Sequence, residues 1–281
     1  MPTMEKIEQV ERCEQFRTQH STGPVLQIVN AWDATSARVL AAAGAPAIGT
    51  TSFGLAFAHG HPDGERIPWD QVCSIARSIV DAVDVPVTVD IEAGRGATAA
   101  EVRRSVADII QAGAVGVNIE DSVPGRPGEM FPPEVQAARH AAAREACVAA
   151  DIPLFINARC DVYFGADVPE TLKLDEVFRR AEIYTAAGVD GLFLPGLLDP
   201  VTLSAITGAV ELPVNVMVGT GAPDLDALVA AGVRRTSQGG EPFIAAAGML
   251  TNLTDRYLEG SFGAPIHDLG AGVALLERLV G

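Results

Sequence analysis

A short phrase, Ala-Gly followed by Ala or Val, recurs along this chain of 281 residues. It occurs within Ala42–Ala45, Gln111–Ala114, Ala186–Val189 and Ala230–Val233. Each copy closes a segment with helical apolar spacing and stands shortly before a β-prone run. Glycine is typical of the residue just after a helix, because without a Cβ atom it enters the left-handed conformation freely. The phrase therefore predicts a repeated passage from helix to strand.

Apolar runs between polar segments predict eight strands along the chain. They cover Val25–Asp33, Ala47–Ser52, Pro86–Glu92, Gly116–Asp121, Leu154–Asp161, Gly191–Pro195, Pro213–Val218 and Arg234–Gln238. Helical spacing predicts intervening helices, among them Ala99–Gln111, Pro133–Ala150, Leu174–Ala187 and Leu225–Ala231. Strict alternation of strand and helix indicates a parallel sheet.

Eight such units in about 250 residues indicate an α/β fold, a (β/α)8 TIM barrel. A doubly wound dinucleotide-binding sheet is disfavoured, because no G-x-G-x-x-G follows the first strand. Met4–Gln19 predicts an additional amphipathic helix before the barrel, and Asp268–Val280 predicts another after it. We expect one domain over residues 1–281, with 1–24 as an N-terminal helical extension and 241–281 as C-terminal helices.

The chain carries 36 acidic and 20 basic residues, a net charge of −16. Such a field repels nucleic acids and anionic membranes, so we expect neither as a partner. An anionic substrate would need local compensation by a buried arginine, backbone amides or a divalent cation. The four cysteines lack the close spacing of a zinc site or disulfide framework. Because no signal-peptide core and no apolar run of about 18 residues is present, we expect a cytoplasmic protein.

Acidic side chains follow two neighbouring strands, at the end where a parallel barrel gathers its functional groups. Asp90 and Glu92 lie two residues apart, hence on one face of the third strand, and Glu120 ends the fourth. Three carboxylates in a small volume repel one another unless a cation or shared protons intervene. Magnesium suits them, because it takes few carboxylates and keeps waters and open positions. The alternative is that Asp90 and Glu92 cap a strand and face water.

Arg159 is the only arginine that ends a central strand, and its planar fork suits bidentate binding of a carboxylate or phosphonate. Its alternative role is a structural salt bridge with Glu120 or Asp161. The segment Thr51–Gly54 follows the second strand and offers hydroxyls and backbone amides to an oxyanion, although a plain turn also explains it. Asn215 adds a polar group on the seventh strand.

Two further residues have a functional and an ordinary interpretation. Asp63 lies in a loop beyond the second strand, where it is placed to contact a metal-bound water. The same Pro-Asp-Gly sequence is also an ordinary turn. Cys160 stands beside Arg159, and a thiolate next to a cation is a possible nucleophile. A packing role for this cysteine is the preferred interpretation.

Taken together, these segments resemble the isocitrate lyase and phosphoenolpyruvate mutase superfamily. The similarity runs from Asn30 to about Gly240, and it is carried by Thr51–Gly54 with Pro62–Gly64, Val89–Gly96, Asn118–Asp121 and Asn157–Asp161. It implies a magnesium-dependent barrel that binds small 2-oxo or 2-hydroxy acids and stabilises an enolate beside a C–C or P–C bond. It also implies a homotetramer in which the last helices, within 241–281, are exchanged between subunits.

The resemblance also implies a role for each matching residue. Asp90 would be the metal ligand, while Asp63, Glu92 and Glu120 would hold the metal's waters. Arg159 would bind the acid group of the substrate. The pyruvyl part would be held by the amides of Ser52 and Phe53 and the hydroxyl of Thr51, and we include Asn215 among the substrate-binding candidates.

The chain departs from the superfamily pattern at three places. Family lyases carry a Lys-Lys/Arg-Cys-Gly-His loop after the fourth strand, and its cysteine is the acid that completes cleavage. This chain has Ser122–Met130 there, which leaves Arg126 and Glu129 as catalytic candidates beside Arg159. Gly196 replaces a glutamate after the sixth strand, and Glu92 replaces the second aspartate of D-x-D. The usual proton path of isocitrate cleavage is therefore not expected.

These features predict a Mg2+-dependent lyase that cleaves a C–C bond of a small 2-oxo or 2-hydroxy acid by decarboxylation or retro-aldol reaction. The metal would withdraw the negative charge that develops on the enolate. Protonation is expected from a metal-held water or from Glu129. One alternative is a phosphonopyruvate-type P–C mutase or hydrolase. Another is a non-catalytic protein that binds 2-oxo acids.

Overall fold

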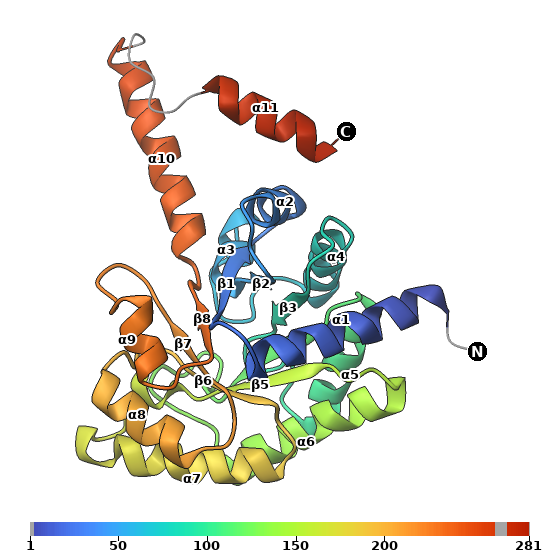
Figure 1. Cartoon of the computed structure of the whole chain (residues 1–281), viewed down its shortest axis with the longest axis vertical. Helices are drawn as coiled ribbons and strands as arrows, with labels where there is room; N and C mark the ends of the chain where they lie inside the picture. Colours follow the sequence, from blue (N-terminus) through green and yellow to red (C-terminus); the bar gives the residue numbers. More distant parts are fainter. Residues whose placement is uncertain (1–2, 262–268, 281) are drawn as a thin grey trace.

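Eight parallel strands close into a barrel in the computed structural model, which describes residues 3–261 and 269–280 (Figure 1). Neighbouring strands pair in chain order and β8 pairs with β1, so the sheet has no open edge. The expected (β/α)8 barrel is thereby confirmed. The strands are β1 (Leu26–Ala31), β2 (Ile48–Thr50), β3 (Val87–Asp90), β4 (Gly116–Glu120), β5 (Phe155–Arg159), β6 (Gly191–Leu194), β7 (Val214–Met217) and β8 (Arg235–Ser237).

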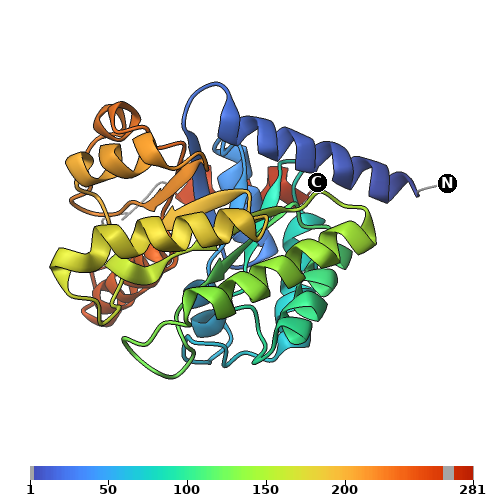
Figure 2. The ribbon, with the colours of Figure 1, turned by 90° about the horizontal axis from the view of Figure 1, so that it is seen from below.

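Helices follow the strands and surround the barrel, and Figure 2 shows α6 and α7 side by side along its flank. They are α1 (Met4–Ser21), α2 (Ala34–Ala42), α3 (Ser52–Ala58), α4 (Trp69–Val80), α5 (Ala99–Gln111), α6 (Pro133–Ala150), α7 (Lys173–Ala186), α8 (Pro200–Ala209), α9 (Leu225–Ala230), α10 (Glu241–Leu258) and α11 (Leu269–Val280). Short 3₁₀ turns occupy Asp161–Tyr163 and Glu170–Leu172.

All eight strands end earlier than the sequence predicted, and after two of them a polar residue caps a helix instead. β1 stops at Ala31, and the Asp33 side chain accepts the Ser36 N–H at 2.6 Å as the N-cap of α2. β2 stops at Thr50, because the Thr51 hydroxyl oxygen accepts the Gly54 N–H at 3.3 Å at the start of α3. Thr51–Gly54, for which a plain turn was the alternative interpretation, therefore forms the N-cap and first turn of a helix.

Helix α1 packs across the amino-terminal end of the barrel strands. Its buried Phe16 ring meets Phe155 of β5 edge-on at 5.6 Å, and His20 stacks on Phe155 at 4.0 Å. Burial lowers the pKa of His20 to about 3, so the ring is neutral near pH 7. The expected helix over Met4–Gln19 is thus present, and it extends to Ser21.

The barrel interior combines small and large residues on alternate strands. Gly49, Gly116 and Gly191 lie on β2, β4 and β6, and a Cβ atom on any of them would come within 2.9 Å of a neighbouring side chain. Arg235 on β8 is 1% exposed, and its Nη2 donates to the Asn118 side chain at 3.3 Å. The glycines therefore leave room for side chains of the neighbouring strands, among them Asn30, Thr88 and Asn157.

Helix α10 projects away from the barrel (Figure 1), and none of its residues is buried. Ile244, Leu250 and Tyr257 are among its exposed apolar residues. α11 returns to contact α2. It corresponds to the helix expected over Asp268–Val280, although Asp268 itself lies outside the described residues. Within the described part of the chain, no helix has both the length and the apolar character needed to cross a bilayer.

Candidate active site

Arg159 is a cation at the carboxyl end of the barrel, between two carboxylates. It pairs in register with Glu120 of β4, and its Nη1 lies 2.8 Å from Glu120 Oε2. Its Nε and Nη2 donate to the two oxygens of Asp161 at 2.6 and 3.1 Å. Both salt bridges expected from the alternative interpretation are therefore formed. Because Asp161 occupies the Nε side of the guanidinium, the Nη1 end faces Glu120.

Burial and charge act together on this ion-pair cluster. Burial by itself lowers the pKa of Arg159. The negative charges of Glu120 and Asp161, with a contribution from Asp90, outweigh this effect, so the pKa of Arg159 lies above its ordinary value. Burial raises the pKa of Glu120 well above its ordinary value, and the nearby carboxylates add to the rise. The guanidinium also lies 5.1 Å from the Phe164 ring centre and 5.9 Å from that of Phe193. Arg159 therefore stays charged.

A buried network behind Asp161 supports Arg159. The Asp161 N–H donates to Asp121 at 2.9 Å. The other oxygen of Asp121 accepts Arg180 Nη1 at 2.9 Å and the Tyr184 hydroxyl at 2.8 Å. Asp121 is 0% exposed and Arg180 is 4% exposed. Sequence reasoning missed this network, because Arg180 and Tyr184 lie on α7, far from Asp121 along the chain, and carry no motif.

Asp90 and Asp63 lie at the same end of the barrel. Asp90 ends β3, and its N–H donates to the Thr50 hydroxyl at 2.9 Å. Asp63 belongs to an exposed loop, yet desolvation of its carboxyl group raises its pKa, and the Asp90 charge raises it further. The Ser52 side chain, which lies near Asp63, lowers this pKa in part. The structure therefore brings Asp63, Asp90 and Ser52 together.

Glu92 differs from the expectation that it shares a strand face with Asp90. β3 ends at Asp90, and Glu92 adopts a φ of 54°, so strand alternation does not apply to it. Its carboxylate accepts two loop N–H groups and forms an ion pair with Arg95. Burial raises the pKa of Glu92 to about 7, with Arg95 opposing and Asp90 adding to the rise. Both oxygens of Glu92 are thus engaged by protein groups.

The donor set at the barrel mouth fits a hard cation that needs few protein ligands. Five carboxyl groups interact electrostatically there, and two guanidinium groups lie among them, Arg95 and Arg159; the carboxyl groups are Asp63, Asp90, Glu92, Glu120 and Asp161. With Arg235, which interacts with Asp90 from inside the barrel, five carboxyl groups stand against three guanidinium groups. No group of three or more His, Cys, Asp or Glu side chains surrounds a common point in residues 3–261 and 269–280. Mg2+ tolerates this arrangement, because waters complete its octahedron.

The first turn of α3 presents backbone amides near this end of the barrel. Because a helix leaves its first N–H groups without intrahelical acceptors, the amides of Ser52 and Phe53 are available to a ligand. The Phe53 ring packs 4.5 Å from Phe57 and 6.4 Å from Phe243 of α10. A Cβ atom at Gly54 would lie 3.2 Å from Trp32, so this turn packs closely. Aromatic contacts thus position the turn.

The remaining predicted residues lie elsewhere. Asn215 is 1% exposed in the barrel interior, where it accepts from Asn157 at 3.2 Å and donates to the Arg235 carbonyl at 3.2 Å. Both ends of its amide are therefore engaged inside the barrel, away from the mouth. Arg126 and Glu129 pair at 3.1 Å on the loop after β4, with side chains 66% and 60% exposed.

The structure explains one departure from the superfamily pattern, Gly196, and the packing interpretation of Cys160. Gly196 has a φ of 80°, and a Cβ atom there would overlap the Tyr163 carbonyl. The chain after β6 therefore passes too close to the preceding loop to carry a glutamate. Cys160 is fully buried, and burial raises the pKa of its thiol well above the ordinary value. A neutral, enclosed thiol fits a packing role.

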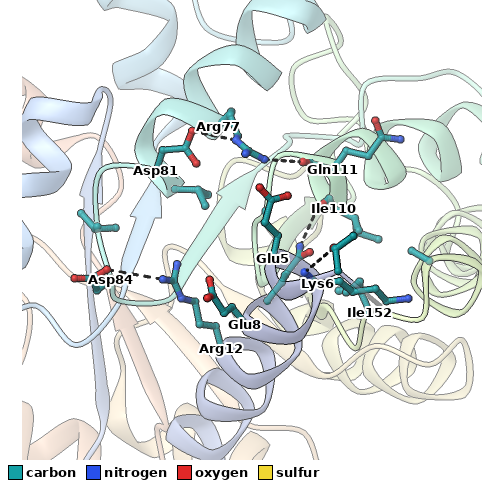
Figure 3. Close-up of a pocket in the computed structure, with 16 residues that line it drawn as sticks. Glu5, Lys6, Glu8, Arg12, Arg77, Asp81, Asp84, Ile110, Gln111 and Ile152 are labelled. Carbon is teal, nitrogen blue, oxygen red and sulfur yellow. Dashed lines mark hydrogen bonds and ion pairs between the residues drawn. The ribbon is translucent and has the colours of Figure 1, made fainter. Parts of the chain in front are cut away.

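A groove of about 400 Å³ lies at the opposite end of the barrel, between α1, α4 and α5 (Figure 3). Its cations are already paired with carboxylates. Arg77 lies 3.0 Å from Asp81, and Arg12 lies 3.9 Å from Asp84. Lys6 also has an acidic partner, at 3.3 Å. All three cations that line this groove are therefore in ion pairs.

Comparison with known proteins places this architecture in a family. A model described as phosphoenolpyruvate phosphomutase matches residues 16–258. The chain belongs to this family. The resemblance to the isocitrate lyase and phosphoenolpyruvate mutase superfamily is thereby confirmed, and the superfamily is one of enzymes.

Three relatives illustrate the range of the family. An uncharacterised protein of Mycobacterium tuberculosis H37Rv, Rv1998c, is 34% identical over 234 residues, which cover 82% of this chain and 83% of that protein. An oxaloacetate decarboxylase of Bradyrhizobium sp. ORS 278 is 32% identical over 244 residues, 84% of this chain and 81% of its own. A solved structure from Burkholderia cenocepacia J2315, provisionally described as a phosphonomutase, is 43% identical with a TM-score of 0.84 and covers 88% of this chain and 99% of that one.

Proposed function

We propose that this chain is a Mg2+-dependent lyase that breaks a C–C bond of a small 2-oxo or 2-hydroxy acid, by decarboxylation or retro-aldol cleavage. The observation that carries the proposal is the Arg159 guanidinium, which Asp161 holds on one side while its Nη1 end faces the acidic barrel mouth. The similarity to an oxaloacetate decarboxylase over most of both chains supports this class of substrate.

The acidic side chains of the mouth would hold the metal. Asp90 is the proposed ligand, and Asp63 and Glu120 would hold its waters. When bound, Mg2+ supplies Lewis-acid stabilisation of the negative charge that appears beside the breaking bond. The excess of carboxylates over guanidinium groups at this end supports the assignment, because an added cation lowers their mutual repulsion.

The protein groups around the mouth would bind and orient the substrate. Arg159 would bind the acid group through its Nη1 end once the Glu120 carboxylate, now 2.8 Å from Nη1, turns to the metal's waters, and the amides of Ser52 and Phe53 would orient the oxo oxygen. The Thr51 oxygen already accepts the Gly54 N–H, so its hydroxyl hydrogen remains as the donor toward substrate. These contacts fix the geometry in which the C–C bond weakens.

Protonation of the enolate involves the loop after β4. This loop begins with an antiparallel bridge between Ser122 and Met130, and Ser122 donates to Asp161 at 2.6 Å. Its base is therefore tied to the Arg159 cluster. Closure of the loop over the mouth would exclude water and bring the Glu129 carboxyl group within reach as a proton donor, with Arg126 as its partner.

The C-terminal helices are proposed to be exchanged between subunits of a homotetramer. α10 exposes several apolar side chains over its length, including Leu250 at 66% and Leu258 at 76%. A groove of about 370 Å³ lies beside α9 and β8, lined in part by Val218, Leu225 and Leu228. A helix from a second copy would cover such surfaces. A cytoplasmic location remains a prediction from the sequence.

An NMR screen of 2-oxo and 2-hydroxy acids with Mg2+ tests the activity. We expect turnover of at least one acid, and loss of turnover on chelation or in Asp90→Ala. Asp84→Ala is the matched control, because Asp84 is an exposed aspartate at the other end of the barrel. Activity that survives both Asp90→Ala and chelation would overturn the metal assignment.

Phosphonopyruvate chemistry is the second candidate, and the 43% identity to the Burkholderia cenocepacia protein is the observation that favours it. The same screen distinguishes the two, because release of inorganic phosphate or an isomerised product from phosphonopyruvate indicates P–C chemistry. Binding of oxaloacetate with Mg2+ but no turnover of any acid would indicate a non-catalytic binding protein.

A further inference from the structure

A reciprocal pair of glutamates ties the loop after α3 to the loop after β3. The Glu92 carboxylate accepts the backbone N–H of Gly64 at 3.0 Å and that of Glu65 at 2.5 Å. The Glu65 carboxylate in turn accepts the backbone N–H of Arg95 at 2.8 Å. Each loop therefore holds the backbone of the other. A shift of either loop alone breaks these contacts.

The buried Arg95 side chain contacts both loops. Its guanidinium forms an ion pair with Glu92, and the two side chains are 6% and 5% exposed. Its Nη1 donates to the Ile67 carbonyl at 3.0 Å, and the guanidinium carbon lies 5.8 Å from the Trp69 ring centre. Because the ion pair is buried, removal of either partner leaves an uncompensated charge. The ion pair therefore holds the loop after β3 together, and the hydrogen bond to Ile67 joins that loop to the loop after α3.

The backbone of the three charged residues is also unusual. Glu65, Glu92 and Arg95 have φ values of 60°, 54° and 56°, in the left-handed region that residues with side chains seldom adopt. Among the described non-glycine residues, only Asp151 at the C-cap of α6 shares a positive φ. Such conformations persist where the surrounding contacts enforce them, and they concentrate at functional sites.

The linked loops carry two aspartates of the proposed metal site. Because Glu92 binds the Gly64 N–H, it fixes the peptide plane that follows Asp63. Glu92 also stands two residues after Asp90, and its own N–H donates to Asp90 Oδ1 at 3.1 Å. One residue is therefore connected to the backbone beside Asp63 and to the side chain of Asp90.

We propose that Glu65, Glu92 and Arg95 form a positioning clamp that holds Asp63 beside Asp90 and so sets the affinity of the barrel mouth for its divalent cation. The inference rests on the proposed function, because it takes the barrel mouth as the metal site. Glu92 then acts through the loop it holds and not as a holder of the metal's waters, since both its oxygens are engaged by the protein.

Binding of Mn2+ to the full-length protein without substrate tests the clamp. Arg95→Met removes the buried ion pair and is expected to weaken Mn2+ binding about tenfold, the scale found for residues that support metal ligands. The matched control is Arg104→Met, which removes an exposed arginine on α5 that pairs only loosely with Glu101 at 3.8 Å. Its Mn2+ affinity should equal that of the wild type.

A double-mutant cycle with Asp63→Asn distinguishes positioning from general damage. If the clamp acts through Asp63, adding Arg95→Met to Asp63→Asn weakens Mn2+ binding little further. If Arg95 supports the fold only in a general way, the two losses multiply. Amide hydrogen exchange gives a readout independent of the metal, because loosening the clamp speeds exchange at Gly64 and Glu65.

Glu65 supplies a second set of variants in case Arg95→Met does not fold. Glu65→Ala removes the acceptor of the Arg95 N–H and should weaken Mn2+ binding, whereas Glu65→Gln retains an acceptor oxygen and should restore it. Wild-type affinity and unchanged exchange in both Arg95→Met and Glu65→Ala would overturn the clamp, as would multiplying losses in the cycle. Failure of the wild type to bind Mn2+ overturns the clamp together with the metal site. If the losses of Mn2+ affinity in Arg95→Met and Asp63→Asn do not multiply, yet the wild type turns over no acid, the clamp is supported and only the proposed function is contradicted.

Discussion

Arg180→Met probes the buried network on which the Arg159 cluster depends. Arg180 is 4% exposed and donates to Asp121, which is itself 0% exposed. Methionine keeps much of the apolar volume of the side chain but leaves the Asp121 charge without its cation. The Tyr184 hydroxyl at 2.8 Å and the Asp161 N–H at 2.9 Å remain as hydrogen-bond donors to Asp121.

Breaking a buried ion pair by removing one partner costs about 3–5 kcal/mol in the free energy of unfolding. Burial already raises the pKa of Asp121, and Arg180 opposes that rise, so the variant raises this pKa further. A carboxyl group with a raised folded pKa favours the folded state at low pH, and this contribution is lost as pH rises through the folded pKa. The destabilisation should therefore be larger at pH 8 than near pH 5.

Denaturant titrations at several pH values measure this effect. Arg179→Met is the matched control, because Arg179 is the neighbouring arginine on α7 and its side chain is 53% exposed in an ion pair with Glu134. Its cost should stay below about 1 kcal/mol. The double variant Asp121→Asn/Arg180→Met removes both charges and should recover part of the loss. A loss below about 1 kcal/mol in Arg180→Met, independent of pH, would refute the reasoning.

Gly196→Ala directs a methyl group at the Tyr163 carbonyl and should lower the free energy of unfolding by more than about 1 kcal/mol. Gly208→Ala, in open space on α8, should raise it by about 0.5–1 kcal/mol, and thermal unfolding measures both variants. Burial lowers the pKa of His140 to about 3, so stability should fall as pH drops below about 6.5, and His140→Gln should flatten that slope in denaturant titrations. Deletion of 241–281 should lower the number of subunits per assembly, as measured by light scattering. An unchanged number of subunits would contradict helix exchange.

The sequence by itself determined the barrel and the placement of most candidate groups. Alternating β-prone runs and helical segments specify a parallel closed sheet, because both periodicities are local properties of the chain. The same alternation places Asp90, Glu120 and Arg159 at strand ends, which parallel strands bring to one edge. Strand boundaries were less well predicted, since Asp33 and Thr51 serve as helix caps.

Only the tertiary structure decided which charged groups pair with one another and which are buried. Local spacing placed Glu92 beside Asp90, but its φ is positive and its carboxylate accepts the N–H groups of Gly64 and Glu65 in the neighbouring loop. Likewise, the burial of Asp121 against Arg180 depends on α7 packing against the 3₁₀ turn Asp161–Tyr163 that follows β5. Burial and pairing are properties of segments that meet through folding, and a pattern read along one segment does not contain them.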